Sequence, residues 1–438
     1  MKITTLKNTF KSFLINEKWI LIVMFLLFVE RFIVLRQFGV MYNLGSDDLS
    51  YVKSGITFIK TGTITMHGVL SAQIMPGMPV FIGIISLIFG EGKLLWAALK
   101  LIWITMGVWS AFFIYKSVSL FAPKWCGIIA SLLLFTPDFV WMDNVILTET
   151  PFMLLLSAMI YYTFMMGKTG QSKYYWLCLA SYFLAFMLKA NIGIYPVFVL
   201  IYLLLKKYNI KVLIKQASIL VCIMLCFLVP WTIRNYIHYD AFIPLTYGSG
   251  NPVLLGTYQG EGYPDDESLD YFKNVDAVAS EKFKKYFDSN GNIKKDYLAK
   301  YISLEKDGIK ARYRISEWFK SDPVGLIKSY LWHKPKYMIT HAFYWKRVFG
   351  VTGETLKTLR SNGFIISVLA FLCAFLLKKR RAEMIFLGIT YMGNIFIYAL
   401  TFAFERYSQT LLPMRFIAFG IGICLFIECL RRRKMSVS

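Results

Sequence analysis

Residues 212–233 read VLIKQASILVCIMLCFLVPWTI, an apolar run with one charged residue, Lys215, near its start. At about 1.5 Å per residue, a helix of this length crosses the roughly 30 Å hydrocarbon core of a bilayer. Similar runs recur through the 438-residue chain, which is 57% hydrophobic and only 17% charged. Soluble domains carry about 25% charged residues. The sequence therefore predicts an all-α polytopic membrane protein.

Apolar runs of this kind predict about ten transmembrane helices along the chain. They cover residues 19–35, 94–115, 125–142, 150–166, 174–188, 192–205, 212–233, 362–377, 384–403 and 407–430. The first run carries Glu30 and Arg31, which we expect to neutralise each other, because a charge that faces lipid is costly. A further run, residues 78–89, is too short to cross as a helix, so we expect it to be re-entrant or interfacial.

The basic residues indicate the orientation in the membrane. The net charge is +23, and much of it lies in short clusters between the apolar runs. The clusters contain Lys116 and Lys124; Lys168 and Lys173; Lys206, Lys207, Lys211 and Lys215; Lys378 to Arg381; and Arg431 to Lys434. If residues 78–89 do not cross, all clusters face the cytoplasm together with both chain ends, as the positive-inside rule requires. This distribution argues against a nucleic-acid partner.

The same topology divides the chain into three parts. Residues 1–233 form a predicted N-terminal transmembrane module, with a first outer loop at residues 37–93. Residues 234–361 are too long for a connector and predict a small, mostly helical extracytoplasmic subdomain. Residues 362–438 return as C-terminal transmembrane helices. This topology predicts a multi-pass protein of the plasma membrane.

Adjacent carboxylates in the first outer loop are the leading candidates for chemistry. Asp47 and Asp48 follow Ser46, outside the first span. Such a pair could supply a general base, or could hold a metal ion or a hydroxyl group. The structural alternative is that Ser46 caps a helix running to about Lys60, with both acids in its first turn. The two interpretations are compatible.

Other charged residues are predicted at the same face of the membrane. Glu149 lies at the outer mouth of the fourth span, and Arg234 and Arg406 lie where the seventh and ninth spans leave the membrane. The positive-inside rule does not explain arginines there, whereas a guanidinium matches the oxygens of a phosphate. Arg406 could instead pair with Glu405. Lys189, between the fifth and sixth spans, is a weaker candidate of the same kind.

The absence of several motifs argues against some classes of protein. The chain has no Gly-x-x-x-x-Gly-Lys-Ser/Thr loop, which argues against an ATP-driven pump, and no nucleophile elbow of a serine hydrolase. Its four histidines and seven cysteines show no spacing of a zinc site. The glycines of residues 247–256 could let the backbone approach a sugar or phosphate, although ordinary turns explain them as well.

Several short motifs together resemble a known family. They are the acidic pair followed by Tyr51; Pro76-Gly77-Met78-Pro79-Val80-Phe81; Leu147-Thr148-Glu149-Thr150-Pro151-Phe152; Pro230-Trp231-Thr232-Ile233-Arg234-Asn235; and Arg406-Tyr407 with Leu412-Pro413. Their order and their shared side of the membrane resemble glycosyltransferase family 39. This family comprises protein O-mannosyltransferase-like and aminoarabinose-transferase-like proteins of the GT-C membrane fold. The resemblance runs from about residue 20 to about residue 420.

The resemblance implies that a sugar passes from a polyprenyl-phosphate carrier, such as undecaprenyl phosphate, to an acceptor hydroxyl on the outer face, with inversion. Asp47 would be the general base, and Asp48 and Glu149 would be further catalytic residues. A divalent cation held by Asp47 and Glu149, and a reaction without a metal, both stay open. The implied substrate-binding residues are Tyr51, Lys189, Arg234, Asn235, Arg406 and Tyr407.

The implied partners are a polyprenyl-phosphate-sugar donor, membrane lipids and a glycan, lipid or protein acceptor of the cell envelope. The family type and the Ile- and Lys-rich composition indicate a bacterial protein. The chain has Ile74 and Met75 where the aminoarabinose transferase has a Glu-Lys pair, so the sugar and the acceptor stay open. Two alternatives remain, a flippase or transporter of lipid-linked saccharides, and a polysaccharide polymerase or ligase with a diphosphate-linked donor.

Overall fold

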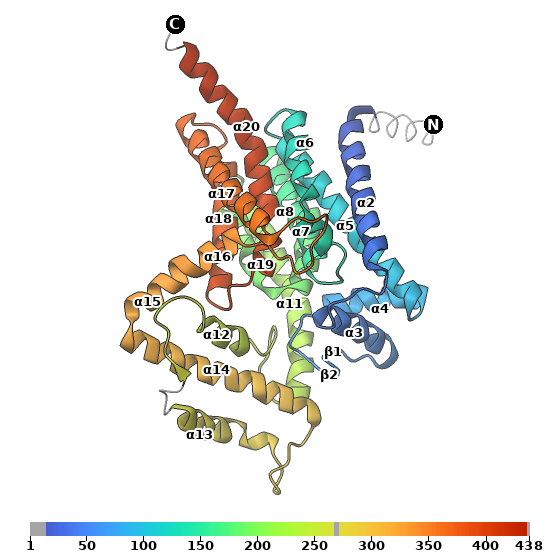
Figure 1. Cartoon of the computed structure of the whole chain (residues 1–438), viewed down its shortest axis with the longest axis vertical. Helices are drawn as coiled ribbons and strands as arrows, with labels where there is room; N and C mark the ends of the chain where they lie inside the picture. The colour runs from blue at the N-terminus through green and yellow to red at the C-terminus, as the bar shows by residue number, and fades with distance from the viewer. Residues whose placement is uncertain (1–14, 267–270, 436–438) are drawn as a thin grey trace.

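The computed structural model describes residues 15–266 and 271–435, which are mostly helical (Figure 1). The start of the first described helix and the end of the last one point to the same end of the molecule, and the helices within residues 250–328 lie at the other end. The first 14 residues and the last three lie outside the described part. The predicted cytoplasmic location of the two chain ends falls on those residues.

The predicted apolar runs are largely helical in the structure. The helices are α2 (Lys18–Phe38), α5 (Lys93–Ser119), α6 (Lys124–Leu132), α7 (Pro137–Met142), α8 (Glu149–Thr169), α9 (Ser172–Leu188), α10 (Tyr195–Leu205), α11 (Ile210–Tyr239), α17 (Gly353–Leu376), α18 (Arg381–Ala399) and α20 (Leu412–Met435). Among the described residues, six of them are long and apolar enough to cross a membrane alone, namely α5, α8, α11, α17, α18 and α20.

Three predicted spans differ from the structure. The run 125–142 is broken into α6, a 3₁₀ turn and α7, because Pro137 lacks an N–H and holds the preceding residue in an extended conformation. The run 192–205 begins as a 3₁₀ turn, Ala190–Ile194, ahead of α10. The last run is also divided, into a short helix α19 (Glu405–Gln409) and α20. The break before α20 leaves Tyr407 outside the last long helix.

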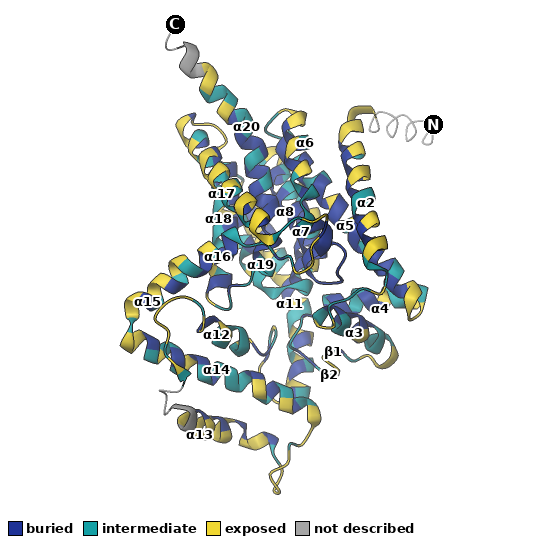
Figure 2. Ribbon diagram, in the orientation of Figure 1, coloured by how far each residue is buried: buried dark blue, intermediate teal, exposed yellow. Residues whose placement is uncertain are grey.

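Helix α8 lies at the centre of the membrane body, and α11 lies at its edge. In the most apolar part of α8, 67% of the residues are buried, against 11% in α11. Helix α17 is also mostly exposed, with 17% of the corresponding part buried, and Figure 2 shows its yellow turns beside the buried α8. The exposed residues of α11 include Val221, Leu225 and Val229, as expected for side chains that face lipid.

The first outer loop folds into α3 (Asp47–Thr61), a hairpin of β1 (Thr65–Met66) and β2 (Val69–Leu70), and α4 (Gly77–Phe89). The short helix predicted at residues 78–89 is α4, which packs against α3 and α5. A Cβ atom on Gly55 of α3 would lie 2.6 Å from Ile82 of α4. The two helices therefore approach each other at a distance that only glycine allows.

The segment after α11 is mostly helical, as predicted. It contains α12 (Gly250–Gly256), α13 (Tyr271–Phe283), a 3₁₀ turn at Lys284–Tyr286, α14 (Asp296–Ser321), α15 (Pro323–Lys328), a π-helical turn at Ser329–His333 and α16 (Lys334–Thr340). Helix α14 packs against α12 and α13. Tyr239, at the end of α11, packs in one apolar cluster with Tyr247, Tyr286 and Tyr301. The end of α11 thus anchors this segment.

A buried ion pair joins α2 to the segment that follows α7. Arg31 Nε donates to Asp143 Oδ2 at 2.7 Å, and both side chains are fully buried. The expected pairing of Arg31 with Glu30 is only a secondary contact, at 3.4 Å. Thr150 Oγ1 also donates to Asp143, at 2.7 Å. The expected pair is therefore present, and Asp143 is a closer partner that the sequence did not show, because the side chain of Arg31 points into the protein.

Replacement of Arg31 by Met should destabilise the protein strongly. It leaves the Asp143 carboxylate buried without its cation, a loss of roughly 3–5 kcal/mol for buried pairs. The matched control is Arg36→Met, on an exposed position of the same helix. Thermal unfolding of the detergent-purified variants, followed by tryptophan fluorescence, should show a large decrease in Tm for Arg31→Met alone. Equal Tm values for the two variants would contradict a stabilising ion pair between Arg31 and Asp143.

Candidate active site

Four charged side chains from distant parts of the chain form a continuous series of ion pairs. Glu149 Oε1 accepts from Lys189 Nζ and from Arg406 Nε, both at 2.7 Å. The same guanidinium donates through Nη1 to Asp47 Oδ2 at 2.8 Å. The series is therefore Lys189–Glu149–Arg406–Asp47, and it joins the ends of α9, α8, α19 and α3.

The local backbone explains why these residues meet. Glu149 is the first residue of α8, and Lys189 follows the last residue of α9 in an extended conformation. Arg406 lies in the short helix α19, where Glu405 instead accepts a hydrogen bond from the Tyr337 hydroxyl at 2.9 Å. The expected alternative, a pair between Arg406 and Glu405, is therefore wrong. Arg406 instead pairs with Glu149 of α8 and Asp47 of α3.

Burial changes along the series. The Glu149 side chain is fully buried, those of Lys189 and Arg406 are 11% exposed, and that of Asp47 is 31% exposed. Burial by itself lowers the pKa of Arg406, but the charges of Glu149 and of other neighbours, including Asp47, raise it well above its usual value. Arg406 is therefore a permanent cation, and Asp47 is the carboxylate of the series that solvent can reach.

The second carboxylate of the acidic pair has a different position. Asp48 is fully buried, and its oxygens accept from the backbone N–H groups of Leu44 at 2.7 Å, Ser46 at 3.3 Å and Leu49 at 2.8 Å. Ser46 is at the N-cap of α3, but its side chain makes no capping hydrogen bond. The predicted cap by Ser46 is therefore wrong, and Asp48 holds this loop.

A polar cavity of about 390 Å³ lies against the ion pairs. It is lined by side chains from the membrane body and from the segment after α11, among them Tyr51, Glu149, Lys189, Asn191, Tyr247, Gly248, Ser249, Asn251, Tyr398, Arg406 and Tyr407. The glycine-containing stretch after residue 246 thus forms one wall. Asp47 does not line this cavity itself but is joined to it through Arg406.

Three buried polar atoms of the cavity wall have no hydrogen-bond partner among the described residues. They are Gln73 Oε1, and Asn191 Nδ2 and the Tyr398 hydroxyl, which lie close to each other but do not meet the geometry of a hydrogen bond. Buried polar atoms are normally satisfied, so an unpaired group requires an explanation. A ligand with several hydroxyl or phosphate oxygens would supply the missing partners. Sequence reasoning did not single out Gln73 or Tyr398, and no local pattern distinguishes Tyr398 among the 27 tyrosines.

Two predicted binding residues lie elsewhere. Arg234 donates to the Ser71 backbone oxygen at 3.2 Å and to Asn235 Oδ1 at 2.8 Å. Asn235 donates to the Ile243 backbone oxygen at 2.9 Å. Neither residue lines the cavity. The reason is that α11 continues to Tyr239 instead of ending at the predicted membrane exit, so both side chains contact neighbouring loops.

The two candidate metal ligands do not fit a divalent cation. Asp47 and Glu149 both turn an oxygen toward Arg406, at 2.8 and 2.7 Å. A cation between them would have to displace the guanidinium. In the described ranges, no three side chains of His, Cys, Asp or Glu form a potential metal site.

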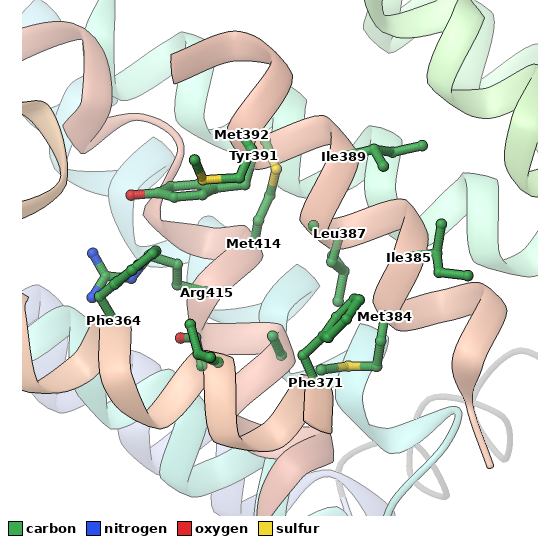
Figure 3. A pocket seen from close by; sticks show the side chains of 14 residues that line it. Phe364, Phe371, Met384, Ile385, Leu387, Ile389, Tyr391, Met392, Met414 and Arg415 are labelled. Carbon is green, nitrogen blue, oxygen red and sulfur yellow. The ribbon is translucent and has the colours of Figure 1, made fainter. Parts of the chain in front are cut away.

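Two apolar cavities lie among the membrane helices. One, of about 370 Å³, is formed by α17, α18 and α20, with Arg415 and Tyr391 near one end and Phe371 and Met384 near the other (Figure 3). The second, of about 300 Å³, lies between α9, α10 and α11. It includes Tyr195, which directly follows the 3₁₀ turn whose first residues line the polar cavity. Both are suited to hydrocarbon chains.

Replacement of Glu149 by Gln should destabilise the protein, because it leaves two buried cations facing each other. The expected loss is roughly 3–5 kcal/mol, as for other broken buried pairs. The double variant Glu149→Gln/Lys189→Met should regain part of the lost Tm, since it removes one of those cations. Glu354→Gln is the control, because this carboxylate is 84% exposed. If Glu149→Gln matches the control in Tm, the series of ion pairs does not exist as described.

Known proteins resemble this chain over part of its sequence and in its fold. Residues 74–233 match the family model of dolichyl-phosphate-mannose-protein mannosyltransferases. No curated protein matches the chain. Among solved structures, ArnT from Cupriavidus metallidurans bound to undecaprenyl phosphate is 12% identical, with a TM-score of 0.43, over 94% of this chain and 78% of ArnT.

The archaeal oligosaccharyltransferase AglB from Archaeoglobus fulgidus, in complex with an inhibitory peptide and a dolichol-phosphate, is 14% identical, with a TM-score of 0.55. The match covers 96% of this chain and 52% of AglB, so the chain spans about half the length of that enzyme. At this identity, the likeness concerns the fold. The family model over residues 74–233 agrees with the resemblance seen in the sequence motifs, and the likeness to AglB shows that the chain has a similar membrane fold.

Proposed function

We propose that the protein transfers a sugar from a polyprenyl-phosphate carrier to an acceptor hydroxyl on the extracytoplasmic face of a bacterial plasma membrane, with inversion. The observation that carries the proposal is the series Lys189–Glu149–Arg406–Asp47 beside a polar cavity. It combines an exposed carboxylate with two fixed cations. These are the groups that an acceptor hydroxyl and a leaving phosphate require.

Asp47 is proposed as the general base. Its Oδ2 accepts from Arg406, which fixes the direction of the carboxylate and leaves Oδ1 on the side away from that guanidinium contact. The acceptor hydroxyl approaches from that side and gives its proton to Asp47. The oxygen of the acceptor attacks the anomeric carbon, and the bond from that carbon to the phosphate oxygen breaks. The sugar then leaves the carrier with inverted configuration, and polyprenyl phosphate is the second product.

Lys189 and Arg406 are proposed to stabilise the leaving phosphate. Glu149 holds both cations at the cavity wall, and each retains N–H donors beyond those used in these ion pairs. Donors fixed before the reaction stabilise developing charge without a cost of reorganisation. Asn191 and Tyr398 add two further polar groups to the cavity wall. Tyr51 and Tyr407 are then walls of the sugar site, and Asp48 is a residue that positions Asp47.

The polyprenyl chain is proposed to lie in the apolar cavity between α9, α10 and α11. This cavity includes Tyr195, next in the chain to the turn that carries Asn191. A carrier with its phosphate at Lys189 would therefore place its first isoprene units along α10. Apolar lining favours hydrocarbon over any polar ligand.

The proposed sidedness follows from charge. The cavity lies at the beginning of α8 and after the end of α9, whereas Lys168 and Lys173 lie at the opposite ends of these helices. The positive-inside rule assigns those lysines to the cytoplasm. The cavity and the segment after α11 are then extracytoplasmic. A flippase would instead need a polar path that opens to both sides.

Asp47→Asn should abolish most of the transfer activity. General bases contribute about 10²–10⁴-fold to rate, and Asn keeps the size of the side chain. Purified protein in lipid nanodiscs, given a carrier lipid with a radiolabelled sugar, should release polyprenyl phosphate only when acceptor is present. The control is Glu91→Gln, which alters an exposed carboxylate paired with Lys60.

Full activity of Asp47→Asn would remove the base assignment. Movement of the intact carrier across the bilayer, without any sugar transfer by the unmodified protein, would favour the flippase instead. Melting temperatures of all variants exclude loss of folding as the cause.

A further inference from the structure

A short hairpin presents a histidine to the proposed base. Strands β1 and β2 pair Met66 with Val69, and the two residues between them, His67 and Gly68, have φ angles of +52° and +85°. Two successive residues with positive φ are typical of a tight hairpin turn whose twist matches the strands. A histidine in this conformation is uncommon, so its position at the tip requires an explanation.

The hairpin is held firmly. The Thr65 N–H donates to Ser54 Oγ at 3.0 Å, which ties β1 to α3. The Tyr239 hydroxyl donates to the Leu70 backbone oxygen at 3.0 Å, which ties β2 to α11. The tip therefore has a defined place above the first turn of α3.

The two ring nitrogens of His67 face different partners. Nδ1 lies 3.1 Å from Ser50 Oγ, and Nε2 lies 3.7 Å from Asp47 Oδ1. A contact at one nitrogen sets the orientation of the ring and the role of the other nitrogen. Ser50 is one turn after Asp47 in α3, so the same helix carries both partners. Oδ1 is the oxygen that Arg406 leaves free.

The proton that Asp47 takes up must leave before the next turnover. Asp47 faces Arg406 across 2.8 Å, with Tyr51, Tyr407 and Lys189 in electrostatic range. Arg406 is already protonated, and Glu149 is fully buried between two cations. His67 is 42% exposed. Among the described neighbours of Asp47, it combines a ring nitrogen that can take up and release a proton with contact to water.

We propose that His67 relays the proton from Asp47 to solvent. This inference rests on the proposed function. The acceptor O–H bond breaks and its proton joins Asp47, while the acceptor oxygen bonds to the sugar and phosphate leaves. The carboxylic acid then passes the proton to Nε2 of the neutral imidazole, which releases it to water or buffer. His67 acts through Asp47 and is a positioning and relay residue.

The test compares His67→Ala with His238→Ala, a histidine of α11 that does not line the cavity. His67→Ala should lower kcat about 10- to 100-fold, within the contribution of a proton-transfer group, with little change in KM. Free imidazole should restore a large part of the lost rate, and the pH–rate profile should change. His238→Ala should match the unmodified protein in rate, profile and response to imidazole.

Two results would overturn the relay. One is an unchanged rate and pH profile for His67→Ala while Asp47→Asn is inactive, which would leave the proposed function intact. The other is a loss of rate that imidazole does not restore, which would indicate a purely structural role.

A measurement without turnover separates the relay from the function. In protein labelled at histidine Cε1, the NMR signal of His67 is identified by its loss in His67→Ala. Asp47→Asn should change the chemical shift of this signal, because the Asp47 carboxylate lies 3.7 Å from Nε2, and should leave the His238 signal unchanged. No movement would contradict the contact even if the unmodified protein transferred no sugar.

Discussion

The arrangement of the site depends on one buried carboxylate, that of Glu149. A charge without access to water is tolerated in a protein interior only when cations and hydrogen bonds surround it. Lys189 and Arg406 supply these contacts, and they come from segments 40 and 257 positions away. The requirement to neutralise Glu149 therefore joins the starts of α8 and α19 to the end of α9. Arg406 in turn reaches Asp47 and adds α3 to the same group.

A second polar network supports this group from the membrane side. Asp143 accepts a hydrogen bond from Thr150, the residue directly after Glu149. Lys100, fully buried in α5, donates to the backbone oxygens of Tyr42 and Asn144. These contacts hold the segment before α8 against the first outer loop. The break in the helix after α6 is thus part of the site, because it places backbone carbonyls where polar side chains can use them.

The sequence predicted the fold better than the details of the site. Apolar runs identify helices because lipid excludes unpaired backbone groups, but they do not show that Pro137 divides one of them. Charges at the mouths of spans are conspicuous, which made Asp47, Glu149 and Arg406 predictable as candidates. Their pairing was not predictable, since it connects positions as much as 359 residues apart. Arg234 was misplaced because hydropathy does not show that α11 continues beyond the membrane.

The most direct test of the account is a cryo-electron microscopy structure of the protein in nanodiscs with a non-hydrolysable analogue of a polyprenyl-phosphate sugar. The account predicts that the phosphate lies within hydrogen-bond distance of Lys189 and Arg406, with the anomeric carbon toward Asp47 and the isoprene units along α10. A phosphate bound beside Arg415, in the cavity of Figure 3, or near Arg234, with the polar cavity unchanged, would contradict it.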